Sequence, residues 1–551
     1  MAMKNEAIVL NNKLFMKEII TGTTDEHNVA MELKNLFQEH GADQVFLEHV
    51  NVMTWYEKEC FLEIGGQRIK CYSLPYTLTD DVEASIVFAN YYGDRISLDN
   101  DPHGKVVVIP FPSDPDDAKF VLLKLYSAGA LAVVFYDILP GRYRRIVVTG
   151  VEGFPFNYGA PPPIPAVSIT KEDYLKLFMR RTDRVRIFIN TRVDHGRYGY
   201  NVIAVYNGSK DHEIIYSVHH DHWFTGFSDD LIGLEIILKF SKKLRRLNNR
   251  KYTTILISFT AEESGAPGYR GWYWIWGSRK YLENRFVKSD LDNILLNINL
   301  DALFTSKVHV SFNLFLHGIV RELVDRGVID SSLLEKEQPY FDSFSFALYG
   351  IPSITLHTFH ELRVNYHTNL DDGREIDPKL EPFMISLLEL LHRIINDKSI
   401  NEIYSFRFLK ERFSINPGID LPLETRVLFR KLADLYNIKS KLDLNKFVKS
   451  FNRNFLKPIA TYKINGSFET QLLPEIMIAM DVLKKIYDLN IKSEVIYSPG
   501  NENRIFEINL ITKQGQRVNE EIIRALYEYI RLSSIKYLDL FNRIMGSTLR
   551  K

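Results

Sequence analysis

Residues 212–240 read HEIIYSVHHDHWFTGFSDDLIGLEIILKF, and this stretch predicts how the chain is folded. Its first part, HEIIYSV, is a short apolar run typical of a buried strand, and it leads into His219, His220 and Asp221. Its last part, DLIGLEIILKF, is a longer apolar stretch typical of a helix. A buried strand followed by such a helix indicates a parallel α/β sheet.

Three further apolar runs lead in the same way into acidic residues or histidine. TTILISFT leads into Glu262 and Glu263, LLNINL into Asp301, and PSITLHT into a loop with Tyr366 and His367. In parallel α/β sheets the ligand crevice lies beyond the carboxyl ends of the strands. These side chains are therefore expected to converge on one site.

The composition is that of an ordinary globular protein. The chain has 551 residues, with 69 Lys and Arg against 69 Asp and Glu, and 45% of its residues are hydrophobic. This length predicts more than one domain, and the balanced charge argues against a nucleic-acid-binding protein. No apolar run is long enough for a membrane helix, and the first residues lack the apolar core of a signal peptide. We therefore expect a cytoplasmic protein that binds neither nucleic acid nor membrane, and the scarcity of Gln and Cys favours a thermophilic source.

Five of the polar residues near the strand ends form a set suited to metal binding. They are two imidazoles and three carboxylates: His219, Asp229, Glu263, Asp301 and His367. Taken singly, each is more often an ordinary core or surface residue, but their joint appearance at several strand ends favours a site. Such ligands suit two zinc ions, with cobalt or manganese as alternatives, and a bridging carboxylate holds such ions about 3.5–4 Å apart. Glu262, next to a ligand but not needed as one, is placed to take the proton of an attacking water.

Five motifs carry a more specific resemblance. They are the two halves of VHHDHWFTGFSDDLIGLE (218–235), FTAEESG (259–265), NLDAL (299–303), and GIPS (350–353) followed by NYHTNLDD (365–372). In this order they resemble the His-x-Asp, Gly-x-x-Asp, Glu-Glu, ligand-Asp and Tyr-His-Thr segments of clan MH, the co-catalytic zinc peptidases of the aminopeptidase and transferrin-receptor-like family. The ten-residue step from His219 to Asp229, with Trp223 between them, is most similar to the glutamate carboxypeptidase II branch.

The resemblance implies a role for each residue. The five residues of the metal set match the family's ligands, with Asp229 as the bridge between the two ions. Glu262 matches the general base, and Tyr366 matches the tyrosine that hydrogen-bonds the oxyanion. Asp221 matches the carboxylate that orients the ligand histidine.

The resemblance also implies the domain order. The expected fold class is α/β, with a mostly parallel mixed sheet flanked by helices, as in zinc aminopeptidases. Residues 1–78 and 190–400 would form a discontinuous peptidase domain, interrupted at 79–189 by an α/β insertion like a protease-associated domain. That insertion is expected to act as a lid over the site. Residues 401–551 would form a mainly helical C-terminal domain with one strand pair, SEVIYS and IFEINLI, around the turn Pro499-Gly500-Asn501.

The two cysteines lie at equal distances from Gly65-Gly66. A two-residue hairpin at these glycines would put Cys60 and Cys71 opposite each other, with their Cα atoms about 5.5 Å apart. Free thiols are nevertheless the expectation for a protein in a reducing compartment.

Two features depart from the family's pattern. An aromatic loop, YRGWYWIWG (269–277), follows the Glu-Glu motif, and such a cluster is more often packing or a subunit contact than a pocket wall. Its closeness to Glu262 keeps a substrate wall open as an alternative. His357 and His360 lie near His367 and compete for its ligand role. Because His357 falls inside a predicted strand and His360 lacks the Tyr-His-Thr context, His367 is the expected ligand.

These features predict a zinc metallo-exopeptidase that acts on peptides. An aminopeptidase is favoured over a glutamate carboxypeptidase, because the arginine-rich recognition of a terminal glutamate cannot be placed residue by residue. A receptor or scaffold without catalysis is disfavoured, because every ligand and the base are present. A glutaminyl cyclase with one zinc is disfavoured by His219 in its complete motif. The preferred side chain stays open, and so does the oligomeric state, a homo-oligomer included.

Overall fold

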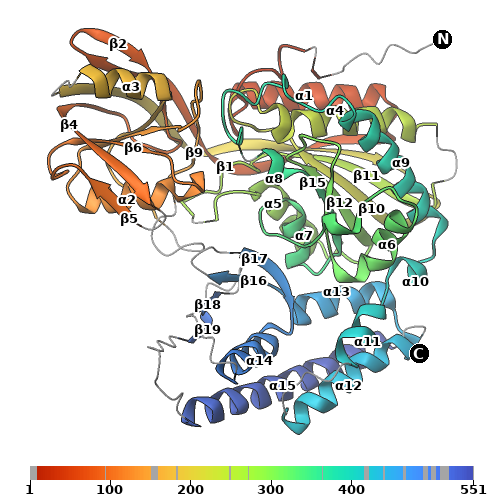
Figure 1. Ribbon diagram of the computed structural model, residues 1–551. Coiled ribbons are helices and arrows are strands. Elements are labelled where there is room, and N and C mark those ends of the chain that lie inside the picture. Colours follow the sequence, from red (N-terminus) through yellow and green to blue (C-terminus); the bar gives the residue numbers. More distant parts are fainter. Residues whose placement is uncertain are drawn as a thin grey trace.

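The computed structural model shows three parts arranged around a long mixed sheet (Figure 1). One part is a helix-flanked sheet, the second is a smaller α/β unit beside it, and the third is a mainly helical C-terminal region. The structure describes residues 9–10, 12–92, 95–149, 159–180, 184–246, 250–270, 272–362, 364–414, 421–438, 441–462, 467–487, 494–497, 504–508 and 520–549.

Four parallel strands form the centre of the first part. They are β10 (Lys210–His219), β11 (Tyr252–Phe259), β12 (Ile294–Asp301) and β15 (Ser353–His357). β10 lies between β11 and β12, and β12 also pairs with β15. Antiparallel strands flank this centre, with β9 (Arg184–Tyr206) beside β11 and, on the other side, β13 (His309–Phe312) beside β15 and then β14 (Leu334–Lys336). The predicted mostly parallel mixed sheet is therefore confirmed.

Helices cover both faces of this sheet. The alternation along β10 decides which side chain faces which layer: Ile214 and Tyr216 belong to one core, whereas Ile215 belongs to the other. The first core lies under α1 (Thr24–Glu39), α4 (Ile232–Leu244), α6 (His317–Asp325) and α9 (Leu380–Asp397). The second lies under α5 (Trp276–Val287) and α7 (Ser343–Leu348).

Helix α1 begins at a capped position. The Thr23 hydroxyl accepts a hydrogen bond from the main-chain N–H of Glu26, which caps the helix, and Gly41 follows its end with a φ of 84°. The Glu26 side chain does not return to the cap. It is fully buried and accepts a hydrogen bond from the Tyr200 N–H, while its Oε1 lies 3.1 Å from His220 Nε2. Glu26 thus ties α1 to β9 and to the strand that carries the histidine motif.

Two long strands connect the first part to the second. β1 (Gln44–Ile64) pairs with β9 along nearly its whole length, and β9 then pairs with β4 (Asp80–Tyr92). From β4 the sheet continues through β6 and β7 to β8 and β3. The remaining elements of this part are β2 (Gln67–Lys70), β3 (Tyr72–Ser73), β5 (Arg95–Leu98), β6 (Val106–Pro110), η1 (Pro115–Asp117), α2 (Ala118–Ser127), β7 (Ala132–Tyr136), β8 (Ala166–Ile169) and α3 (Lys171–Arg180).

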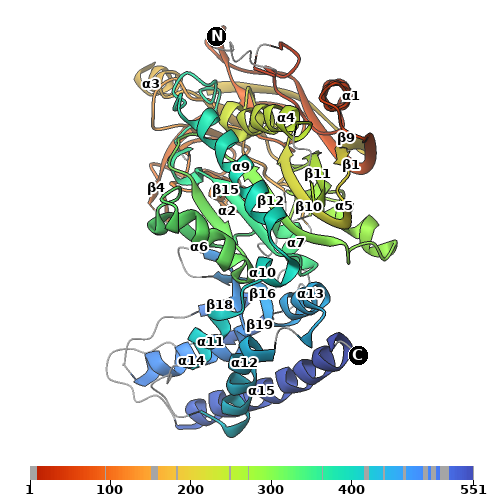
Figure 2. The ribbon, with the colours of Figure 1, turned by 90° about the vertical axis from the view of Figure 1, so that its right-hand side faces the viewer.

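The C-terminal region lies at one end of the molecule in both views (Figures 1 and 2). Its helices are α10 (Ile400–Ile403), α11 (Arg407–Phe413), α12 (Leu423–Ile438), α13 (Leu444–Phe455), α14 (Pro474–Tyr487) and α15 (Glu520–Thr548). A four-stranded antiparallel sheet accompanies them, formed by β16 (Leu456–Tyr462), β17 (Ser467–Leu472), β18 (Glu494–Tyr497) and β19 (Arg504–Ile508).

The strand pair predicted for this region is confirmed as β18 and β19, whereas β16 and β17 were missed. The missed strands contain few contiguous apolar residues, so the sequence pattern that predicts a strand was weak there. The predicted turn at Pro499 to Asn501 lies outside the described residues. None of the helices described here is both long and apolar enough to span a membrane.

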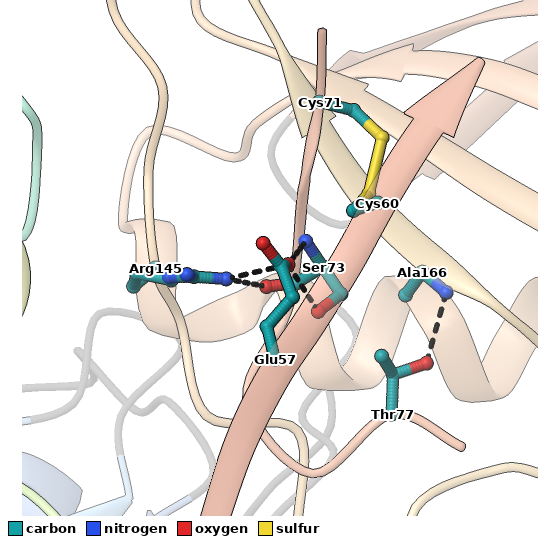
Figure 3. Close-up of a disulfide and its surroundings, with 7 residues drawn as sticks. All are labelled: Glu57, Cys60, Cys71, Ser73, Thr77, Arg145 and Ala166. Atoms are coloured by element: carbon teal, nitrogen blue, oxygen red, sulfur yellow. Dashed lines mark hydrogen bonds and ion pairs between the residues drawn. A yellow bond between two sulfur atoms is a disulfide. The ribbon is translucent and has the colours of Figure 1, made fainter. Parts of the chain in front are cut away.

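The expectation of free thiols is wrong in this structure. Cys60 and Cys71 are joined in a disulfide, with their Cα atoms 5.6 Å apart, as expected for residues that face each other across a hairpin (Figure 3). The hairpin itself is confirmed, since Ile64 pairs with Gln67 around the two glycines. The assumption of a reducing compartment led to the expectation of free thiols, whereas the geometry of the hairpin favours a disulfide.

The disulfide can be tested by counting thiols. Protein purified without reductant and unfolded in guanidinium should show no titratable thiol, and the same protein should show two after reduction. The sequence contains only these two cysteines, so the count is unambiguous. Two thiols before reduction would restore the free-thiol expectation.

Candidate metal centre

The carboxyl ends of the parallel strands bring the predicted ligands together. His219 is the last residue of β10 and Asp301 the last of β12. Glu263 follows the end of β11, and Asp229 lies in the turn Phe227–Leu231 that precedes α4. His367 comes from the loop after the short helix α8 (Phe359–Leu362). All five side chains are buried.

Asp229 lies between two groups of ligands. Its Oδ1 is 3.3 Å from His219 Nε2, which is in turn 3.9 Å from Asp301 Oδ1. Its Oδ2 is 3.7 Å from His367 Nε2, which is in turn 2.7 Å from Glu263 Oε2. The site therefore contains two ligand triads that share one carboxylate, each compact enough to hold an ion.

The donor atoms fit zinc. In the part of the chain that the structure describes, His219 Nε2 and Glu263 Oε1 are buried and have no hydrogen-bond partner. Burial and neighbouring carboxylates raise the pKa of Glu263 and of Asp301 well above the usual range, which shows how unfavourable their negative charges are without a cation. Imidazole nitrogen and carboxylate oxygen are zinc ligands, and a divalent ion would balance the charge.

The backbone at the site is held in an unusual conformation. Ala261, directly before the Glu-Glu pair, has a φ of 56°, Ala302, directly after Asp301, has 48°, and His367 has 56°. Residues other than glycine rarely adopt these left-handed values, which cost of order 1–3 kcal/mol each. Three such positions at the ligands indicate that packing and hydrogen bonds elsewhere hold the site in place.

Asp221 contacts the site differently from the expected way. His219 Nδ1 lies 2.9 Å from the main-chain oxygen of Asp221, so this carbonyl, and not the carboxylate, orients the imidazole. The carboxylate accepts the main-chain N–H groups of Glu262 and Glu263, each at 3.1 Å, and the Thr21 hydroxyl at 2.9 Å. Asp221 therefore fixes the turn that carries the base and a ligand. A motif names the residue but not the atom that makes the contact.

Glu262 lies beside the two triads without belonging to either. Its main-chain oxygen accepts a hydrogen bond from the N–H of Ile275 at 2.7 Å, so the aromatic loop and Asp221 hold it from both sides. Burial, followed by the nearby charges of Asp301 and Glu263, raises the pKa of its carboxyl well above the usual range. A bound cation would lower that pKa again, because it favours the ionised form.

Tyr366 stacks on His367, with ring centroids 3.7 Å apart. Burial and the charges of Asp116 and Glu263 raise the pKa of its hydroxyl well above the ordinary value, so the hydroxyl keeps its proton and can donate a hydrogen bond. The main-chain oxygen of Tyr366 accepts a hydrogen bond from the buried Arg144, which also pairs with Asp137.

The second part of the chain lies directly against this segment. The Arg145 N–H donates to the His367 carbonyl at 3.0 Å, and the Arg145 guanidinium binds Glu18 and Glu57, as Figure 3 shows for Glu57. Arg144 forms an isolated bridge with Thr368. Residues before β8 thus support the segment that carries Tyr366 and His367.

The aromatic loop divides its residues between packing and the site. Trp272 packs on Phe344, and Trp274 donates its indole N–H to the carbonyl of Pro339. Tyr273 is buried next to the metal centre, where burial and the charges of Asp116 and Glu263 raise the pKa of its hydroxyl. Trp272 and Trp274 are therefore packing residues, whereas Tyr273 lies close enough to Glu263 to keep the alternative of a substrate wall open.

Sequence reasoning missed Asp116 and Lys119. Both lie near Tyr273: the negative charge of Asp116 raises its pKa, and Lys119 Nζ is 5.4 Å from its ring centroid. They come from η1 and α2, about 100 residues before the first ligand motif, and no local pattern marks them. His357 and His360, the competitors of His367, contact Glu335 instead of Asp229.

Comparisons with known proteins agree with this geometry. Residues 201–384 match the model of peptidase family M28, and no curated protein matches the chain. A zinc aminopeptidase from Bacillus subtilis aligns at 18% identity over 69% of this chain and 92% of that chain, with a TM-score of 0.53. A peptidase M28 precursor from Shewanella amazonensis aligns at 16% identity over 70% of this chain and 90% of that chain, with a TM-score of 0.54.

At identities of 16–18% the two structures support the fold alone, whereas the family match covers the residues of the site. All five ligand candidates, Glu262 and Tyr366 lie inside the matched residues 201–384. Residues 201–384 therefore form a domain that matches peptidase family M28, and the protein is a zinc metallopeptidase.

Proposed function

We propose that the protein is an aminopeptidase that uses two zinc ions to remove residues from the amino end of peptides. The observation that carries the proposal is the position of Asp229, whose two oxygens face separate ligand triads. His219 and Asp301 would hold one ion, Glu263 and His367 the other. A single-ion cyclase would leave one complete triad without a purpose.

The protein's own residues divide the remaining chemistry. Zinc, when bound, polarises a carbonyl and lowers the pKa of a water. Glu262 takes a proton from the attacking water and returns it to the departing amine. Tyr366 keeps its proton and donates a hydrogen bond to the oxygen on which negative charge develops. Asp221 keeps Glu262 and Glu263 in place through their main-chain N–H groups.

The charge at the site favours an amino terminus over a carboxylate. The charge of Asp116 acts on the pKa of Tyr273, Tyr366 and His367, so this residue of the second part of the chain lies near the metal centre. Its neighbours Asp114 and Asp117 outnumber Lys119, which leaves the η1 segment net negative. A protonated α-amine is attracted to such a surface, whereas a terminal carboxylate is repelled by it.

Removing the shared carboxylate should empty both triads. Asp229→Ala is expected to bind two fewer zinc ions than the parent, measured by elemental analysis of protein purified without chelator. Asp325→Ala, on the exposed face of α6, is the control and should keep the parent's zinc. Loss of one ion only would favour a mononuclear centre and therefore a cyclase.

Glu262→Gln separates the base from the ligands. Glutamine keeps the shape but cannot accept a proton, so the variant should keep the parent's zinc while its turnover of aminoacyl amides falls by about 10² to 10⁴. Glu283→Gln, an exposed residue of α5, should change neither quantity. If Glu262→Gln turns over at the parent's rate, the base is a different group.

Asp116→Asn tests which end of the peptide is bound. Losing a charge-assisted hydrogen bond to the α-amine should raise KM for unblocked aminoacyl amides by about 10- to 100-fold. Asp101→Asn, exposed on a loop of the same part, serves as control. The reverse pattern, in which Lys119→Met impairs cleavage of N-blocked peptides and Asp116→Asn has no effect, would identify a carboxypeptidase.

A further inference from the structure

A second group of metal-type ligands lies at the edge of the same sheet. His309 comes from β13, Glu335 from β14, His357 from the end of β15, and His360 from α8. The side chains of these four residues lie close together, and they form a group separate from the ligand triads around Asp229. The first three elements are neighbouring strands. Helix α8 follows β15 directly.

The distances within this group are those of side chains around one point. Glu335 Oε1 is 2.6 Å from His309 Nδ1 and 3.1 Å from His360 Nε2. Its other oxygen, Oε2, is 3.4 Å from His357 Nε2. The rings of His309 and His360 are close as well, with centroids 4.9 Å apart. Donor atoms from His309, Glu335 and His360, one from each, lie within 4.8 Å of one another, close enough to surround one metal ion.

We propose that His309, Glu335 and His360 bind a further zinc ion, separate from the co-catalytic centre, with His357 as the fourth ligand. Zinc lies about 2.0–2.2 Å from nitrogen and carboxylate oxygen in tetrahedral sites, which places neighbouring ligand atoms roughly 3.3 Å apart. The separations of 3.1 and 3.4 Å lie close to that value, and the 2.6 Å between Glu335 and His309 is shorter, at hydrogen-bond length. A set of imidazoles with one carboxylate suits zinc better than it suits calcium or magnesium, which prefer oxygen alone.

The surroundings also resemble those of a metal site. Glu361 Oε1 lies 3.5 Å from His309 Nε2, the ring nitrogen that faces away from Glu335. A carboxylate in this position fixes the tautomer and orientation of a metal-bound histidine. Among the buried atoms that the structure describes, Glu361 Oε2 and His357 Nδ1 have no hydrogen-bond partner. His360 is half exposed, which gives an ion a route from solvent.

A zinc ion here would act on structure and not on the reaction. Helix α8 has one turn, and the Leu362 carbonyl at its end accepts the N–H groups of Asn365 and Tyr366. The Phe359 ring also contacts the Tyr366 ring, with centroids 5.2 Å apart. Tying His360 to β13 and β14 would therefore fasten the base of the segment that carries Tyr366 and His367.

Zinc counts test the proposal. The variants His309→Gln, His360→Gln and Glu335→Gln should each bind one zinc fewer than the parent. His317→Gln, a partly exposed histidine of α6 outside the group, should keep the parent's count. Equal zinc content in the parent and all three variants would overturn the proposal. This holds even if the variants change the pH dependence of stability, because that change alone needs no metal.

Asp229→Ala keeps this test separate from the proposed function. That variant should retain one zinc, and His309→Gln added to it should remove the last one. After chelation, added zinc should raise the unfolding temperature of Asp229→Ala, because the ion binds only the folded state. The same zinc should not shift the double variant. No zinc-dependent shift in Asp229→Ala would overturn the further site, whatever the co-catalytic centre does.

Discussion

The crowding of buried negative charge at the strand ends is the constraint on which this molecule depends. Asp229, Glu262, Glu263 and Asp301 meet in a region shielded from water, where two like charges 4 Å apart repel by about 4 kcal/mol at an intermediate dielectric. Divalent cations relieve that repulsion only if the carboxylates stay at fixed positions. The positive φ angles beside the ligands and the hydrogen bonds from Asp221 are the means by which the chain keeps them there.

Much of this arrangement could be predicted from the sequence, because it follows from strand direction. His219, Glu263 and Asp301 come at or just after the ends of parallel strands, and such ends meet at one edge of a sheet. The hairpin at Gly65-Gly66 was equally local and equally predictable. The role of the Asp221 carboxylate was not, since a sequence pattern does not say whether a carbonyl or a carboxylate makes a contact.

Contacts between distant segments could not be predicted from the sequence, for a physical reason. Asp116 and Tyr273 reach the centre only because two parts of the chain pack together, and nothing in their own neighbourhoods records that packing. A mixed aromatic cluster that includes Trp55, Trp223 and Tyr273 fills this junction. The disulfide was missed for a different reason: geometry predicted that Cys60 faces Cys71, and an assumption about the compartment outweighed it.

The long strands shared by the two parts have a mechanical consequence. β1 contains 21 residues and β9 contains 23, so each extends about 70 Å through both units without a loop between them. Two domains joined by a flexible loop can rotate freely relative to each other. Two domains joined by a continuous two-stranded ribbon cannot, because the hydrogen-bonded ribbon resists bending and returns to its original shape. The ladder is interrupted at the register shifts between Val52 and Thr54 and between Glu57 and Glu59. Any movement of one part relative to the other would have to bend this ribbon, and Arg145, bound to Glu57, lies beside one of the two interruptions.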